Sequence, residues 1–485
     1  MIREPLIFEI SDKGKRAFGL PKLDVPEAAG ALAGLPVRAE IEDFPQVSEV
    51  ELVRHFTRLS QQNYCLDVGF YPLGSCTMKY NPKVNEKVAA LPGFNSAHPY
   101  APLDTVQGCL EVIKRLEDCL CEIAGLDAFT LQPSAGAQGE LTGMMLVRAY
   151  LEKQGNPRKS VLMPDSAHGT NPSSAHLCGY TVQEIKSNAR GMVDLEELDR
   201  RMNGDVAALM LTNPNTLGVF ESDICRIAEI VHAKGGLLYM DGANMNALTG
   251  MVRPGDMGVD VIHINLHKTF STPHGGGGPG SGPVGVKRIL EPFLPVPIVE
   301  KNGGSFGLNF ARPDSIGRVR GFYGNFLVMV KALAYILALG PQGMREIAEV
   351  AVLNSNYIRK SLEGVYHLQY DDATMHEVVF DDKFQKDAHG ITNLDIAKRL
   401  IDYGVHPPTM SFPLIVHGAL MIEPTETESK RDLDDFIATM KTIAREAEET
   451  PEVLKDAPHH SYVRRLDETA AARHPIVKWE RPKTP

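Results

Sequence analysis

Lys268 ends an apolar run and is the residue of this chain whose position most favours covalent chemistry. The run, VDVIHI at residues 259–264, is typical of a buried strand, and a glycine-rich stretch, GGGGPG at residues 275–280, follows. Desolvation in an apolar interior disfavours the charged form of an amine. A neutral lysine amine can form a Schiff base with an aldehyde cofactor. A surface lysine before a loop is the alternative interpretation.

Two further segments place chemically useful groups after apolar strands. Residues 134–140, SAGAQGE, follow one strand and open a helix. Small residues let backbone N–H groups approach an anion, and a helix N-terminus favours negative charge, so this segment suits a phosphate. Asp241 ends another strand, where a buried carboxylate needs strong hydrogen bonds or a cation such as a pyridinium nitrogen. A plain helix cap and a capping aspartate in a turn are the respective alternatives.

Two loops complete this set. His168 lies in DSAHGTNP, residues 165–172, and its ring could stack on an aromatic cofactor. Asn215 lies in TNPNTLG, residues 212–218, and amides of this turn could reach a phenolic oxygen. An ordinary loop histidine and a Pro/Asn/Gly turn are the simpler explanations of each residue alone.

Strands that alternate with helices connect these segments. The strands form continuous apolar runs, which predicts an α/β fold with a mainly parallel sheet covered on both faces. Functional groups collect at the carboxyl ends of such strands, so all five segments are expected at one edge. The predicted strands are residues 127–131, 160–163, 206–211, 236–240 and 259–264, and the predicted helices are 138–154, 194–202 and 224–234.

A chain of 485 residues is expected to divide into several parts. Prolines punctuate an N-terminal arm, residues 1–75, which contains a predicted helix at 49–61. A large domain at 76–345, a smaller α+β domain at 346–450 and a polar tail at 451–485 follow. The predicted elements of the small domain are helices at 347–362, 391–403 and 433–448 and strand-like segments at 366–370 and 377–380.

Composition and charge exclude some classes of protein. The net charge of −11 leaves no basic surplus for nucleic acid. The N-terminus lacks a signal-peptide pattern, and the longest apolar stretch, residues 326–339, contains Lys331 and is too short to cross a bilayer. Seven irregularly spaced cysteines indicate reduced thiols and a cytoplasmic location. The C-x-C of Cys119 and Cys121 lacks a second pair, so no metal site is expected.

Two nucleotide-binding patterns match only superficially. The glycines of residues 275–280 fit G-x-G-x-x-G, but Pro279 and Pro283 prevent the helix that a dinucleotide fingerprint requires. Residues 280–285 have the glycine spacing of a P-loop, but Val286 stands where the lysine should be. The sequence therefore disfavours NAD and ATP.

The order of phosphate loop, histidine loop, Asn-Pro turn, aspartate and lysine resembles the fold-type I pyridoxal-phosphate enzymes. The resemblance implies that Lys268 carries pyridoxal 5'-phosphate covalently and that Asp241 pairs with its pyridine nitrogen. It also implies that His168 stacks on the ring and that Ala243 packs on the other face. The remaining predicted cofactor contacts are Ser134, Ala135, Gly136, Ala137 and Gln138 at the phosphate, with Asn215 and His267.

Four longer motifs make the resemblance closer. Residues 71–79 (YPLGSCTMK), 165–172, 265–270 (NLHKTF) and 420–426 (LMIEPTE) are similar to the glycine decarboxylase P-protein family of the glycine cleavage system. The length fits the second subunit of the two-subunit bacterial form. The match covers most of the chain.

This resemblance implies an enzyme that decarboxylates glycine and passes the aminomethyl group to the lipoyl group of the H-protein. The implied partners are the first P-protein subunit, in an α2β2 assembly, and the lipoylated H-protein, with no nucleic acid and no membrane. His274 is a candidate for binding the glycine carboxylate. Thr77 and Lys79 are candidates for the pocket, or parts of a structural turn around Gly74.

Two other interpretations remain open from the sequence. Another fold-type I enzyme, such as a serine hydroxymethyltransferase or a cysteine desulfurase, could share the lysine motif, but the runs at 73–78 and 421–426 argue against it. A non-catalytic scaffold subunit is expected to have lost Lys268 or Asp241, and both are present.

Overall fold

The computed structural model describes residues 4–26, 30, 33–38, 41–276 and 280–480. The middle of the glycine-rich stretch, residues 277–279, lies outside the described residues, and with it part of the G-x-G-x-x-G match. The chain forms two compact units, residues 69–455 and a unit made of residues 1–68 with 456–485.

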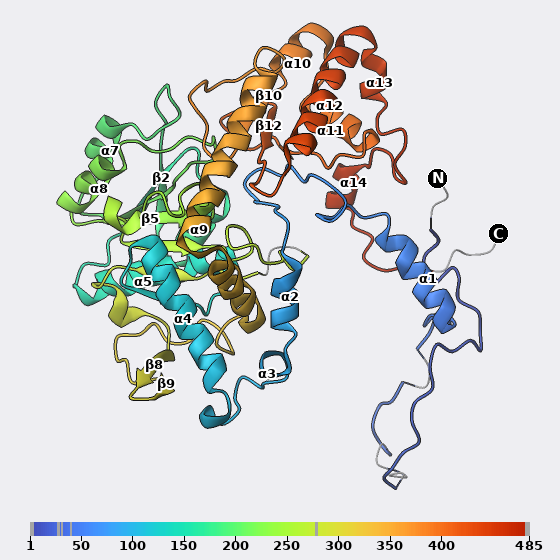
Figure 1. Ribbon diagram of the computed structural model, residues 1–485, viewed down its shortest axis with the longest axis horizontal. Helices are drawn as coiled ribbons and strands as arrows, with labels where there is room; N and C mark the ends of the chain where they lie inside the picture. Colours follow the sequence, from blue (N-terminus) through green and yellow to red (C-terminus); the bar gives the residue numbers. More distant parts are fainter. Residues whose placement is uncertain (1–3, 27–29, 31–32, 39–40, 277–279, 481–485) are drawn as a thin grey trace. The chain divides into compact units, whose positions relative to one another are not determined.

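A seven-stranded sheet lies at the centre of the larger unit (Figure 1). Six strands run parallel to one another, and β7 is antiparallel to both of its neighbours. The α/β fold with a mainly parallel sheet is thereby confirmed. In spatial order the strands are β1 (Ala128–Thr130), β7 (Val284–Val286), β6 (Val261–Ile264), β5 (Leu237–Gly242), β4 (Val206–Thr212), β2 (Ser160–Pro164) and β3 (Thr181–Ile185).

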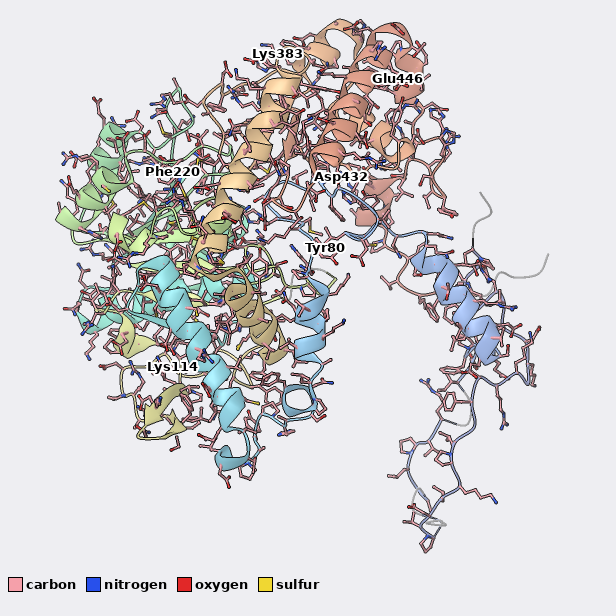
Figure 2. The ribbon with its side chains drawn as sticks, in the orientation of Figure 1. Tyr80, Lys114, Phe220, Lys383, Asp432 and Glu446 are labelled. Carbon is pink, nitrogen blue, oxygen red and sulfur yellow. The ribbon has the colours of Figure 1, made fainter. Side chains whose placement is uncertain are left out.

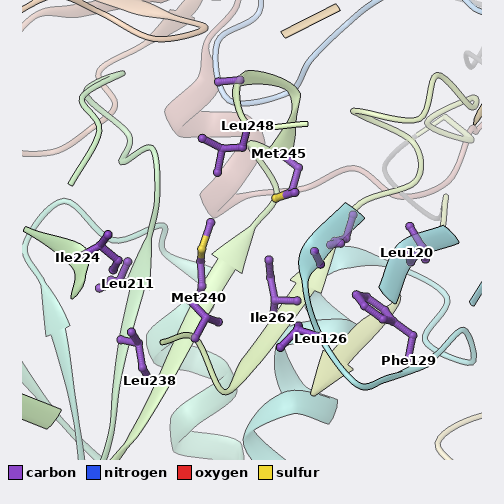
Figure 3. Close-up of a cluster of buried hydrophobic side chains, with 14 of the residues drawn as sticks. Leu120, Leu126, Phe129, Leu211, Ile224, Leu238, Met240, Met245, Leu248 and Ile262 are labelled. Carbon is purple, nitrogen blue, oxygen red and sulfur yellow. The ribbon is translucent and has the colours of Figure 1, made fainter. Parts of the chain in front are cut away.

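The central strands are apolar throughout because both of their faces are buried. Leu238 and Met240 of β5 join one hydrophobic cluster, in which Figure 3 shows them beside Ile262. Leu237 and Tyr239 join a second cluster on the opposite face. Helix α5 (Gly136–Lys153) contributes to the second cluster, whereas the first receives side chains from α4 (Gln107–Ala124), α7 (Leu195–Arg201), α8 (Ile224–Ala233) and α9 (Phe326–Leu362).

The predicted helices and strands of this region are confirmed, with shifts of a few residues at their ends. Asp194 caps α7 as predicted, because its carboxylate accepts the amides of Glu196 and Glu197. Several elements were not predicted: α2 (Lys83–Ala89), α3 (Pro92–Asn95), α4, α6 (Thr170–Leu177), β3, β7 and the hairpin β8–β9 (Ile298–Asn302 and Ser305–Asn309).

The C-terminal part of the larger unit is an α+β layer around a three-stranded antiparallel sheet. Its strands, in the order β10-β12-β11, are Val378–Asp381, Ala419–Ile422 and Thr409–Met410, and its helices are α10 (Lys383–His389), α11 (Asn393–Asp402), α12 (Lys430–Glu449) and α13 (Pro451–Lys455). The predicted strand at 366–370 is wrong. Tyr366 and His367 form only isolated bridges, because the Tyr366 amide donates to the Leu362 carbonyl (3.2 Å) in the turn that follows α9. The Tyr366 hydroxyl donates to the Met440 carbonyl (2.9 Å).

Helix α9 runs through the boundary predicted at residue 345 (Figure 1). Gly340 has a non-helical backbone and Pro341 follows it, so α9 is two helices joined at a kink.

Helix α9 is long and apolar enough, by length and composition alone, to cross a membrane. The kink divides α9, and the first half of the helix is shorter than the roughly 20 residues that a spanning helix needs. The domain boundary at 345 stays a prediction.

The smaller unit combines the two ends of the chain. Helix α1 (Glu49–Ser60) begins with a capping box between Ser48 and Glu51. Phe8 stacks on Trp479, with ring centroids 4.8 Å apart. A short helix, α14 (Glu468–Arg473), belongs to the same unit.

Candidate active site

Lys268 lies just past the carboxyl end of β6 and is surrounded by buried titratable groups. Its Nζ donates to the Ser75 carbonyl (2.6 Å). Its charge shifts the pKa values of many neighbouring side chains. Lys268 therefore lies within a cluster of titratable groups, and the alternative interpretation of a surface lysine before a loop is wrong. These neighbours are Cys76, Glu140, His168, Asp241, His263, His267, His274, His376, Glu377 and Glu423.

Asp241 is a buried carboxylate on the strand next to β6. The sheet register pairs it with His263, whose Nε2 lies 3.2 Å from Asp241 Oδ1. The Ala243 amide donates to the same oxygen (2.9 Å), and Asn171 reaches Oδ2 at 3.3 Å. Burial alone would raise the pKa of Asp241. The interactions with His263, with the Ala243 amide and with Lys268 outweigh burial and lower this pKa, so Asp241 is ionised.

The sequence did not single out His263, which is hidden inside an apolar strand. The available signal was its position: a histidine in a strand buried on both faces needs a polar partner. Burial lowers the pKa of His263, so the ring is neutral. Its other nitrogen, Nδ1, lies 2.9 Å from the Tyr239 hydroxyl.

His168 belongs to a hydrogen-bonded chain after β2. Its Nδ1 lies 2.8 Å from the Thr170 hydroxyl, which in turn lies 2.8 Å from Glu140 Oε1. Burial lowers the pKa of His168, so its ring is neutral and suited to stacking. Burial, followed by repulsion from Asp241, raises the pKa of Glu140 to about 7. Glu140 was not predicted as a site residue.

Glu140→Gln is expected to remove part of the pH dependence of stability in the cofactor-free protein. With a folded-state pKa of about 7 against the ordinary 4.5, Glu140 keeps its proton in the folded chain while the unfolded chain loses it. Wild-type stability contributed by Glu140 is therefore present below pH 4.5 and is lost as the pH rises through 7. Between pH 5 and pH 8, the free energy of unfolding measured with urea should fall by about 2 kcal/mol less in Glu140→Gln than in the wild type.

Glu152→Gln, at an exposed position of the same helix, serves as the control and should retain the wild-type pH dependence. If the free energy of unfolding changed equally with pH in Glu140→Gln and the wild type, Glu140 would already be ionised at neutral pH.

The predicted phosphate segment, residues 134–138, joins β1 to the start of α5. Ala135 occupies the N-cap position and gives no side-chain cap, so the first-turn amides of Gly136, Ala137 and Gln138 are suited to an anion. The Gln138 side-chain oxygen accepts both the amide and the hydroxyl of Ser134 (2.7 Å each). The start of α5 follows β1, which is a strand of the same sheet as β5.

His267 and Asn215 have partners within the protein. Burial lowers the pKa of His267 to about 3, and its Nδ1 accepts the Ser281 amide (3.3 Å). Asn215 donates to the Gly191 carbonyl (2.8 Å) and its oxygen accepts two amides of its own turn. This arrangement gives Asn215 a structural role, and its contact with a cofactor stays a prediction.

Two motifs that lie far apart in the sequence meet beside Lys268. Thr77 donates through its amide to Glu423 Oε2 (3.0 Å) and through its hydroxyl to Oε1. Lys79 instead pairs with Glu426 (2.8 Å), away from the Lys268 neighbours named above. Thr77 therefore lies at the site, whereas Lys79 holds its loop in place.

The donor set fits pyridoxal phosphate. Asp241 is an ionised buried carboxylate whose Oδ2 has, within the described part of the chain, a single long contact, which suits a protonated pyridine nitrogen. Lys268 supplies the amine for the cofactor aldehyde. Helix α5 supplies an N-terminus without a side-chain cap, which suits the phosphate. Some buried polar atoms at these strand ends have no hydrogen-bond partner among the described residues, which is typical of a polar ligand site. They are Asn171 Oδ1, Asn265 Oδ1, Thr269 Oγ1 and Thr272 Oγ1.

Fold and site together define the class of fold-type I pyridoxal-phosphate enzymes. A solved glycine decarboxylase (P-protein) of the glycine cleavage system, in inhibitor-bound form, superposes with a TM-score of 0.72 at 22% identity, over 85% of this chain and 94% of that one. A NifS-like protein gives a TM-score of 0.61 at 14% identity, over 78% of this chain and 99% of that one.

The sequence comparisons identify the family. The profile "Glycine cleavage system P-protein" matches residues 24–307, and "Glycine dehydrogenase, C-terminal domain" matches residues 347–461. Relatives named "Probable glycine dehydrogenase (decarboxylating) subunit 2" are 58% identical in Caldanaerobacter subterraneus and 56% identical in Alkaliphilus oremlandii, each over 98% of both chains. The chain belongs to the glycine cleavage system P-protein family.

Proposed function

We propose that this chain is the pyridoxal-phosphate-binding subunit of a glycine decarboxylase of the glycine cleavage system. The observation that carries the proposal is the placement of Asp241 at the end of β5 and of Lys268 just past the end of the adjacent strand β6, where the charge of Lys268 acts on Asp241, in a chain 58% identical to a glycine dehydrogenase (decarboxylating) subunit 2.

Each site residue has a task in this reaction. Bound pyridoxal phosphate supplies an electron sink for the pair left when the glycine carboxylate departs as CO2. Asp241 would keep a proton on the ring nitrogen, because its ionised carboxylate stabilises a positive charge beside it. Lys268 would hold the cofactor through its Nζ. Neutral His168 would pack on the ring, and the first turn of α5 would hold the phosphate.

His274 is the proposed contact of the glycine carboxylate. Its Nε2 is buried and has no hydrogen-bond partner among the described residues. Burial, followed by the charge of Lys268, lowers the pKa of His274 to about 4. When the ring hydrogen lies on Nε2, a neutral imidazole can donate to a carboxylate without fixing it by a full charge, which leaves the carboxylate free to depart.

The second half of the proposed reaction passes the aminomethyl group to the lipoyl disulfide of an H-protein. Exchange of labelled bicarbonate into the glycine carboxyl group tests this assignment. Exchange is expected only when this chain, the first P-protein subunit and lipoylated H-protein are present together. Turnover of serine with a folate acceptor, without bicarbonate exchange, would instead show a serine hydroxymethyltransferase-like enzyme.

The smaller unit supports the proposal of a first-subunit partner in an α2β2 assembly. Phe18, Leu20 and Leu23 expose 76%, 85% and 72% of their surface. Such a run of exposed apolar side chains in an extended segment is typical of a surface that another chain covers.

The free state of all seven cysteines supports a cytoplasmic location.

The double variant Phe18→Ser/Leu20→Ser is expected to bind the first P-protein subunit at least about tenfold more weakly, because it removes two apolar anchors. Co-purification and titration by light scattering measure this loss. Its circular dichroism should match the wild type, since both side chains are exposed. Unchanged affinity would place the partner elsewhere.

A further inference from the structure

The carbonyl that accepts the hydrogen bond of Lys268 belongs to a loop with an unusual backbone conformation. Ser75, whose carbonyl accepts from Lys268 Nζ (2.6 Å), has φ +64°, and Thr77 has φ +42°. Both lie in the left-handed region, which costs a residue with a side chain about 1 kcal/mol or more. Such a backbone persists only where its surroundings hold it.

Two glutamates of the C-terminal α+β layer hold this loop. Glu377, just before β10, accepts the Ser75 amide at Oε2 (2.7 Å). Glu423, just after β12, accepts the amide and the hydroxyl of Thr77. Gly74 donates to the Met421 carbonyl (3.2 Å), and a Cβ at Gly74 would lie 2.2 Å from the Met421 side chain.

The Lys268 loop is fastened to the same segment at its other end. The Ser271 hydroxyl donates to the carbonyl of Tyr80 (2.7 Å), which is labelled in Figure 2. Asn81 also reaches the Ser271 hydroxyl, at 3.3 Å. Residues 74–81 therefore bridge the lysine loop and the two glutamates.

The two glutamates are buried completely and lie close together. One oxygen of each, with a ring nitrogen of His376, falls within 4.8 Å of the others. Burial raises the pKa of Glu377 well above its ordinary value, and repulsion from Glu423 adds to this effect. Burial also raises the pKa of Glu423, so the pair retains a proton at neutral pH. Among the described residues, their other charged or titratable neighbours are Lys268, Cys76, His274 and His376.

We propose that Glu377 and Glu423 are positioning residues that fix the Ser75 carbonyl as the acceptor for the Lys268 amine whenever that amine is not bonded to the cofactor. The proposal rests on the proposed function. When a substrate ammonium replaces Lys268 on the aldehyde carbon, one C=N double bond would form to the substrate nitrogen and the C=N double bond to Lys268 Nζ would break. The three hydrogens and the positive charge of the ammonium pass to Lys268 Nζ, and Ser75 accepts one of these hydrogens. The released lysine is thereby held clear of the substrate.

Chemical labelling of Lys268 in the cofactor-free complex with the first subunit tests this role. The hydrogen bond to the Ser75 carbonyl holds Lys268 Nζ in one place, so losing it leaves the amine freer to reach the reagent. Trace acetylation at neutral pH, followed by mass spectrometry of the Lys268 peptide, should be about tenfold faster in Glu377→Ala, since hydrogen bonds to charged groups are strong. Glu377→Gln should stay within about twofold of the wild type, because an amide oxygen still accepts the Ser75 amide. Thr77→Val, which keeps the Thr77 backbone and loses only its hydroxyl, should give a smaller increase.

Glu221→Ala is the matched control. Glu221 is another buried glutamate that accepts a backbone amide, from Val193, and its loss should leave Lys268 labelling unchanged. Wild-type labelling in Glu377→Ala, or equal acceleration in Glu377→Gln or Glu221→Ala, would overturn the proposal. The cofactor is absent from this assay, so the result does not depend on whether the enzyme decarboxylates glycine.

Discussion

Lys268→Arg is expected to lower glycine–bicarbonate exchange by at least about 10³-fold, because a guanidinium cannot form a covalent link to an aldehyde. The substitution keeps the positive charge beside Asp241 and Glu423, whose pKa values respond to Lys268. The protein should therefore fold, and pyridoxal phosphate should bind only non-covalently. Visible absorption spectra with isotope exchange measure both effects.

Lys268→Ala provides the companion variant, since a small external amine can take the place of the missing side chain. Added methylamine should restore part of the exchange in Lys268→Ala and none in Lys268→Arg, where the larger side chain fills the space. Full exchange in Lys268→Arg would contradict the assignment of Lys268.

Asp241→Asn is expected to lower exchange by about 10² to 10⁴-fold, the range of a group that stabilises charge in the reacting complex. Asparagine still accepts the Ala243 amide, so the geometry of the strand end is preserved. It cannot neutralise a protonated pyridine nitrogen, so the ring loses its capacity to accept electrons. The value of kcat for exchange should fall far more than the affinity for pyridoxal phosphate.

Asp260→Asn is a matched control, because Asp260 is buried at the other end of the same pair of strands. It contacts His232 (2.7 Å) and the Leu238 amide (2.8 Å). Its loss should reduce stability and leave kcat near the wild-type value. Equal falls in kcat for both variants would assign Asp241 a purely structural role.

The parts of the site that the sequence predicted are those set by local pattern. Continuous apolar strands followed by polar residues place Lys268, Asp241 and His168 at one sheet edge, because parallel strands present their carboxyl ends together. The strand predicted at 366–370 failed because so short an alternation of apolar and polar residues, YHLQY, fits a core-lining coil as well as a strand.

Glu377, Glu423 and His263 were beyond local prediction for a different reason. His263 becomes a partner of Asp241 only through the register between β5 and β6. Glu377 and Glu423 reach the site from the C-terminal layer, more than 300 residues from the loop that they hold. Long-range pairing of this kind follows from the folded topology, and no spacing in the chain encodes it.

Borohydride reduction of the enzyme with pyridoxal phosphate tests the central claim most directly. Reduction converts the link between a lysine and the cofactor aldehyde into a stable bond, and peptide mapping then identifies the lysine. The pyridoxyl group is expected on the peptide that contains Lys268, with loss of the visible absorption. A pyridoxyl group on any other lysine, or no fixed cofactor from a protein that absorbs in the visible range, would contradict the assignment of Lys268 as the anchor.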